Sequence, residues 1–122
     1  NKTGRSIGEG RFVSLPHQVF NSSGYKSSSP IARAVLIELA MRYNGSNNGY
    51  IACSVRELAD RCNASKDTCA RAIQELEDCG LVETLKRGSF KLSNRKASEY
   101  RIVWRYCNVS QCQPERKYLI ER

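Results

Sequence analysis

The stretch SVRELADRCNASKDTCARAIQELEDCG, residues 54–80, contains two amphipathic helical patterns separated by a two-residue connector. In the first pattern, four apolar residues recur at the spacing of one helix face: Val55, Leu58, Ala59 and Cys62. In the second, five apolar residues lie on one side of a helix over 65–79: Cys69, Ala72, Ile73, Leu76 and Cys79. The stretch therefore predicts two short helices that each bury one face and expose the other.

Both helices carry start signals. Ser54 is followed three residues later by Glu57, which is the spacing of a capping box. Ser65 is placed to cap the second helix, and Gly80 is placed to end it. The residues between the helices, Asn63 and Ala64, predict a tight turn.

The flanking sequence supplies a third helix and a small sheet. PIARAVLIELAMRY, 30–43, is apolar over more than half of the helical wheel and predicts a central helix. NGSNNG, 44–49, stops it, and YIAC, 50–53, predicts a short strand. After Gly80 the apolar period becomes two, so 81–86 and 99–106 predict a β-hairpin with one buried face. We expect Tyr100, Ile102, Trp104 and Tyr106 on that face, and Arg101, Val103 and Arg105 on the other.

The predicted fold class is therefore α+β, with three helices, a short strand and a C-terminal hairpin in a chain of 122 residues. We expect an N-terminal arm over 1–29, a main domain over 30–106 and an extension over 107–122. The arm is expected to contain a short helix, with Ser14 as its cap and Pro16 in its first turn. Because residue 1 is Asn and no signal segment follows it, we expect a piece trimmed from a longer protein.

Charge and cysteine content limit the kinds of partner and of functional site that we expect. The net charge is +8, and residues 86–105 alone contribute +6, with seven basic residues against Glu99. Such clustering favours a polyanionic partner. The six cysteines are expected to be free thiols in a reducing cytoplasm, because three of them occupy apolar helical positions. No zinc-ligand spacing or catalytic constellation is present, so we expect no metal, no cofactor and no enzymatic activity.

Two short amphipathic helices joined by a tight turn form a helix-turn-helix, which presents the second helix outward. A DNA major groove is wide enough to admit such a helix. Base contacts are then predicted for five residues of the exposed stripe: Lys66, Asp67, Thr68, Arg71 and Gln74. Phosphate contacts are predicted for three residues near the helix starts: Ser54, Arg56 and Ser65. The acidic residues Glu75, Glu77 and Asp78 would be repelled by phosphates, so we expect the N-terminal half of the helix to enter the groove.

Residues 30–106 resemble the winged helix-turn-helix family, most closely in SVRELADRCNASKDTCARAIQELEDCGLVE, 54–83. The resemblance implies that 86–96 is the wing. Its implied phosphate or minor-groove contacts are Lys86, Arg87, Lys91, Asn94, Arg95 and Lys96. The segments FVSLPHQVF, YNGSNNGYI and ASEYRIVW are similar to small helix-turn-helix proteins of bacterial prophages, plasmids and integrative elements.

The leading interpretation is a sequence-specific regulator of double-stranded DNA in a bacterial mobile element, acting as a homodimer in the cytoplasm at the nucleoid. An origin-binding domain of a plasmid or phage replication initiator is the alternative with the same contacts. A winged-helix module for protein interactions, in which the arm or the extension contacts another protein, is the alternative of another class. Its support is the acidic segment 65–85, with a net charge of −3 from two basic and five acidic residues.

Overall fold

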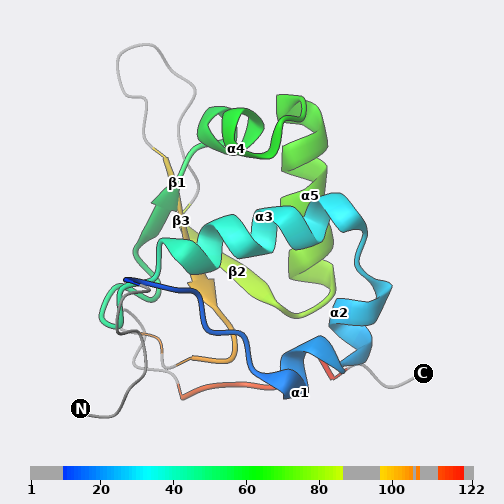
Figure 1. Ribbon diagram of the computed structural model, residues 1–122, viewed down its shortest axis with the longest axis vertical. Helices are drawn as coiled ribbons and strands as arrows, with labels where there is room; N and C mark the ends of the chain where they lie inside the picture. Colours follow the sequence, from blue (N-terminus) through cyan, green and yellow to red (C-terminus); the bar gives the residue numbers. More distant parts are fainter. Residues whose placement is uncertain (1–9, 87–96, 106, 108–112, 120–122) are drawn as a thin grey trace.

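The computed structural model describes residues 10–86, 97–105, 107 and 113–119. The elements run in the following order along the chain: α1 (His17–Phe20), α2 (Ser23–Ser27), α3 (Pro30–Met41), β1 (Ile51–Cys53), α4 (Val55–Cys62), α5 (Lys66–Asp78), β2 (Val82–Lys86) and β3 (Ser98–Ile102) (Figure 1). The predicted central helix, short strand, helix pair and hairpin are all present, so the α+β prediction is confirmed. None of the described helices has the length and apolar character needed to cross a membrane.

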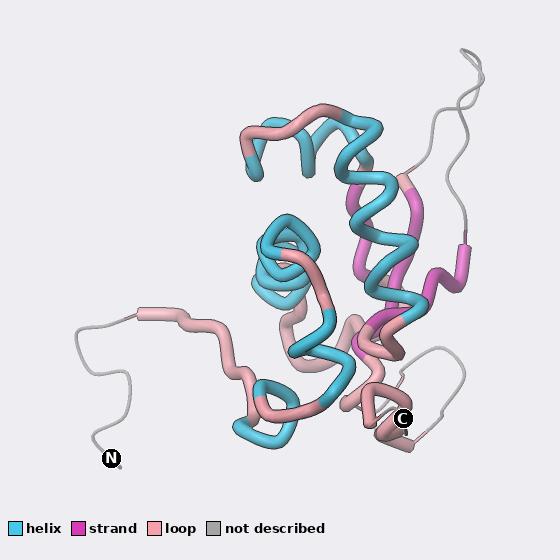
Figure 2. Tube along the Cα trace, turned by 90° about the vertical axis from the view of Figure 1, so that its right-hand side faces the viewer, coloured by secondary structure: helices cyan, strands magenta, loops and turns pink. Residues whose placement is uncertain are grey.

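The three strands form one antiparallel sheet in the order β1-β3-β2. Ile51 of β1 pairs with Tyr100 of β3, and Val82 of β2 pairs with Ile102 of β3. Strand β3 therefore lies between the short strand and the first strand of the hairpin. Figures 1 and 2 together show α3 and α5 on one side of this sheet, with α4 beside the N-terminal end of α5.

The core lies where α3, α4 and α5 meet the sheet. Leu36 and Leu39 of α3, Leu58 of α4 and Leu76 of α5 have no exposed surface, and Ile51 of β1 closes the cluster. Each such side chain contributes roughly 1.5–3 kcal/mol by leaving water. The predicted inner faces of 54–62 and 65–79 are thus confirmed, and they fix which face of α5 remains outside.

Three serines begin the three long helices. The Ser54 hydroxyl accepts from the Glu57 amide at 3.0 Å while a Glu57 carboxylate oxygen accepts from the Ser54 amide at 3.0 Å, so the predicted capping box is confirmed. Ser65 caps α5 as predicted, by accepting from the Thr68 amide. Ser29, whose role the sequence did not reveal, caps α3 by accepting from the Ala32 amide.

Strand β3 is shorter than the sequence predicts, because a buried asparagine ends it. The Asn48 side chain accepts from the Ile102 amide at 2.6 Å and donates to the Ile102 carbonyl at 3.0 Å and the Arg105 carbonyl at 3.2 Å. This amide takes the place of a neighbouring strand, and the chain turns at Val103–Arg105. Trp104 consequently lies beyond the strand, and Tyr106 lies outside the described residues.

The hairpin does not have the single buried face that the sequence predicts. Arg101, expected on the exposed face, is 2% exposed, and Val103 is fully buried. The Arg101 guanidinium donates to Glu83 at 2.7 Å through Nε and pairs with Glu115 through a terminal nitrogen. Two carboxylates thus neutralise a charge that would be costly to bury alone. Arg101 is therefore not part of a basic outer surface.

The segment 113–119 packs along the sheet and the end of α5. The Glu115 amide donates to the Val103 carbonyl at 2.8 Å, and the Tyr118 carbonyl accepts from the Gly24 amide at 2.8 Å. The backbone of Lys117 and Tyr118 crosses so close to Gly24 and Gly80 that neither position has room for a Cβ atom. This segment is called the C-terminal strap below.

The N-terminal segment also joins the core. Val19 of α1 is buried, and Val13 and Leu15 pack against the cluster. The prediction that Ser14 caps this helix is wrong: Pro16 is the residue before α1, which begins without a side-chain cap. Helix α2, capped by Ser22, is an addition that the sequence did not predict. The predicted domain limits at 29 and 106 stay a prediction.

Candidate nucleic-acid interface

Helix α5 presents a polar stripe away from the core. Its buried face consists of the residues that the sequence predicts: Cys69, Ala72, Ile73 and Leu76. Its exposed residues lie on the opposite side: Lys66, Asp67, Ala70, Arg71, Gln74 and Asp78. This set is called the α5 stripe. In the part of the chain that the structure describes, the C-terminal strap contacts the Gly80 end of the helix and leaves the stripe open.

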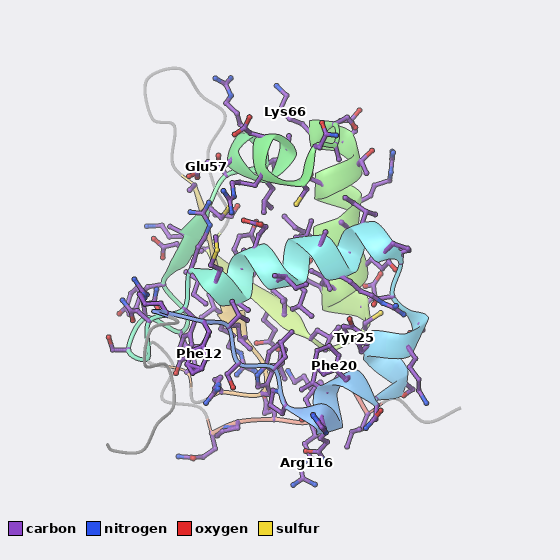
Figure 3. The ribbon with its side chains drawn as sticks, in the orientation of Figure 1. Phe12, Phe20, Tyr25, Glu57, Lys66 and Arg116 are labelled. Atoms are coloured by element: carbon purple, nitrogen blue, oxygen red, sulfur yellow. The ribbon has the colours of Figure 1, made fainter. Side chains whose placement is uncertain are left out.

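The N-terminal end of α5 projects from the body of the molecule. Figure 3 shows Lys66 at the top of the view, beside α4 and at the far end of the molecule from Arg116. Thr68 is half-buried, and its hydroxyl accepts from the Ser65 hydroxyl at 2.8 Å. Ser65 and Thr68 therefore stabilise the first turn, whose unpaired amides and partial positive charge suit an anion.

Arg71 and Gln74 differ in how firmly they are held. Arg71 is exposed, and no ion pair or hydrogen bond to another described residue restrains its guanidinium. The Gln74 amide is exposed too, but its Nε2 donates to Asp78 Oδ1 at 3.1 Å. Both side chains have the donors and acceptors that base edges recognise.

Two of the three acidic residues near the end of α5 have structural roles. Glu75 accepts from the Ser29 amide and hydroxyl, and Glu77 accepts from the Thr84 amide at 3.1 Å. From the sequence, both were expected only to repel phosphates. In the structure, the Glu75 carboxylate binds the start of α3 and the Glu77 carboxylate binds β2. Ser29-Pro30, a cap followed by proline at the first helical position, signals the start of α3 but gives no sign of its contact with Glu75. Glu77 had no sequence signal, because Thr84 becomes its neighbour only when the hairpin folds.

The predicted phosphate contacts lie in different settings. Arg56 is exposed on α4, and Lys86 is exposed at the end of β2. Ser54 is half-buried in its capping box, where Glu57 also pairs with Arg42 at 3.6 Å. That capping bond, more than Arg42, lowers the pKa of the Glu57 carboxyl. The remaining predicted wing contacts lie outside the described residues: Arg87, Lys91, Asn94, Arg95 and Lys96.

Arg105 was predicted to belong to the basic hairpin, but its side chain lies against an aromatic ring of the protein. Its guanidinium lies 5.6 Å from the centroid of the Tyr43 ring, beside the end of α3. With Arg101 buried, two of the seven basic residues between 86 and 105 are thus occupied within the protein. Of these two, Arg101 is paired with Glu83 and Glu115 and adds no basic charge to the surface.

The cysteines contribute packing to this region. Cys53, Cys62, Cys69, Cys79 and Cys107 are free thiols. Burial raises the pKa of the Cys53 thiol to about 11, so it stays protonated at neutral pH. Among the described residues, no group of three or more His, Cys, Asp or Glu side chains is arranged to hold a metal ion.

Comparisons with known proteins agree with this architecture. Residues 29–82 match the family model described as "Helix-turn-helix domain". A solved structure described as "N-Terminal domain of DNA binding protein" superimposes with a TM-score of 0.51 at 22% identity, covering 82% of this chain and 79% of that chain. A search of curated proteins gives no significant match. Residues 29–82 are thus similar to a helix-turn-helix domain. The order of α4, the Asn63–Ala64 turn and α5, followed by the hairpin of β2 and β3, is that of a winged helix-turn-helix fold.

Proposed function

We propose that this domain binds double-stranded DNA by placing the exposed side of α5, from Lys66 to Gln74, in the major groove. The observation that carries the proposal is the exposure of Arg71 and its neighbours on the face of α5 opposite the core. The distance from Lys66 to Gln74 along the helix is about 12 Å at roughly 1.5 Å per residue. That length suits a major groove about 12 Å wide. The description of the similar solved structure as part of a DNA binding protein gives further support.

The proposed contacts divide by chemistry. Arg71 is suited to a bidentate bond with guanine, and Gln74 is suited to adenine. Lys66, Asp67 and Thr68 would contact the neighbouring bases. Arg56 on α4, together with the first turns capped by Ser54 and Ser65, would hold phosphates, as would Lys86 and the wing. The proposal assigns the domain a binding role and no catalysis.

We further propose that the full protein is a transcriptional regulator of a bacterial mobile element and binds its operator as a homodimer. Helix-turn-helix dimers read half-sites about one helical turn apart, so paired half-sites in selected DNA would report the dimer. An origin-binding role in a plasmid or phage initiator uses the same contacts. A second winged domain or a helicase-loading tail in the full-length sequence would favour this role.

The protein-interaction alternative is weaker for a specific reason. It rested on the acidic character of 65–85, but three of the five acidic residues there are bound within the protein: Glu75 to Ser29, Glu77 to Thr84 and Glu83 to Arg101. They do not form a free acidic surface for a partner protein.

The test is selection of bound sites from a random duplex library, followed by affinity measurements on the recovered site. Arg71→Ala should lose about 1–3 kcal/mol on that site and relax the preference at one base pair. Arg116→Ala, an exposed arginine at the opposite end of the molecule (Figure 3), is the matched control and should change neither. If the protein binds no duplex at low salt, the proposal is wrong.

A further inference from the structure

Asp78 occupies a position where an acidic residue is unfavourable. It ends α5, where the helix dipole places partial negative charge, and the last turn of the helix holds no basic residue. Its side chain is exposed on the α5 stripe. If the stripe meets DNA as proposed above, the carboxylate also faces the phosphates. Residues that break a local rule often mark functional sites.

The fold gives Asp78 no structural role of the kind that Glu75 and Glu77 have. Those two carboxylates turn inward and bind backbone amides of Ser29 and Thr84. Asp78 instead accepts from Gln74 Nε2 at 3.1 Å, across one helical turn. Within the described residues, the hydrogen bond to Gln74 is therefore the contact that explains why an acidic side chain stands at position 78.

This bond fixes which way the Gln74 amide points. A free glutamine amide rotates and offers donor and acceptor in either order. When one Nε2 hydrogen is held by Asp78, the Oε1 acceptor is turned away from Asp78, and the second Nε2 hydrogen stays available. Adenine presents a donor at N6 and an acceptor at N7, which this fixed amide matches. Guanine presents two acceptors, which it does not match.

We propose that Asp78 is a positioning residue that orients Gln74 and thereby sets a preference for adenine over guanine at one base pair. The inference rests on the proposed function. It adds a residue that need not contact DNA, and it gives that residue two effects of opposite sign. The carboxylate improves discrimination between bases, while its charge weakens attraction to every duplex.

The experiment compares three variants on the site selected by the unaltered protein. The position read by Gln74 is the one at which Gln74→Ala loses its preference. At that position, Asp78→Ala should reduce the ratio of adenine to guanine affinity by about 5-fold or more, since a good bidentate pair supplies roughly that much discrimination. The same variant should bind random duplex more tightly. Asp78→Asn retains an Oδ1 acceptor, so it should keep the adenine preference while also binding random duplex more tightly.

Asp60→Ala is the matched control, because it removes an exposed carboxylate from α4 without contact to Gln74. It should leave the adenine preference unchanged. The proposal is overturned if Asp78→Ala keeps the full preference, or if Asp78→Asn loses as much as Asp78→Ala. It is also overturned if Gln74→Ala changes no position of a site that the unaltered protein clearly selects. Absence of any duplex binding by the unaltered protein would instead refute the proposed function.

Discussion

Glu75 of α5 caps the first turn of α3 through Ser29. One carboxylate oxygen accepts from the Ser29 amide at 2.5 Å, and the other accepts from the Ser29 hydroxyl at 2.8 Å. The same hydroxyl caps the Ala32 amide at 3.2 Å. A single residue of the helix that carries the α5 stripe thus joins that helix to the start of the central helix.

Glu75→Ala should lower the free energy of unfolding by about 2 kcal/mol, because it leaves the Ser29 amide without its acceptor and weakens a helix cap. Glu75→Gln keeps one acceptor and should cost less. Urea denaturation followed by circular dichroism measures both. The exposed Asp60→Ala control should stay within about 0.5 kcal/mol of the unaltered protein. Equal stability of Glu75→Ala and Asp60→Ala would contradict this role for Glu75.

Gly80 and Gly45 form a natural pair for testing the strap. Both have left-handed backbone, with φ of +78° and +99°, but a Cβ at Gly80 would meet the Lys117 backbone whereas one at Gly45 would meet nothing. Gly45→Ala should cost about 1–2 kcal/mol for the backbone conformation alone. Gly80→Ala should cost clearly more, because the strap must also move. Thermal unfolding of the two variants compares them directly, and equal losses would mean that the strap does not pack against Gly80.

The Arg101 network predicts a loss of stability in acid. The hydrogen bond from Arg101, followed by that from Lys117, lowers the pKa of the Glu83 carboxyl below its ordinary value of 4.5. A carboxyl whose pKa is lowered by folding stabilises the protein above its unfolded pKa, and this contribution disappears as the pH falls through the folded value. Between about pH 7 and about pH 3, Glu83→Gln should therefore lose less stability than the unaltered protein. Urea midpoints at the two pH values measure this difference, and equal losses would contradict it.

Arg56 gives a test of the phosphate contacts that does not depend on base recognition. Arg56→Ala should weaken binding to all duplexes alike and should reduce the slope of log affinity against log salt by about one. Fluorescence anisotropy at several salt concentrations measures the slope. Arg116→Ala, which removes the same charge at the opposite end of the molecule, should leave the slope unchanged (Figure 3). A smaller slope in both variants would mean that the effect comes from net charge alone.

Local patterns were enough to predict most of the elements. The capping box at Ser54, the cap at Ser65 and the apolar spacing through Leu76 all depend on neighbours within a few residues, and all are confirmed. The winged helix-turn-helix resemblance is likewise confirmed at the level of fold. The exposed stripe of α5 follows from the same periodicity, because the residues that face the core determine which residues face away from it.

Apart from the Ser14 cap, which was a local error, the wrong predictions involve partners distant in the sequence. The sequence predicts Asn48 to be a turn residue, yet its side-chain amide ends β3 more than fifty positions later. Arg101 alternates with apolar residues and therefore appears exposed, but Glu83 and Glu115 reach it from two other segments. The base and phosphate contacts themselves stay predictions, including those of the wing beyond Lys86.

The C-terminal strap has a practical consequence for anyone who wishes to isolate the helix-turn-helix part of this protein. Cutting the chain after residue 82, where the family match ends, would remove β3 together with Arg101. Cutting it after 107 would leave the Arg101 guanidinium without Glu115 and would expose Gly24 and Gly80, which the strap covers. We therefore expect the smallest stable folding unit to be larger than the recognisable motif and to include Tyr118.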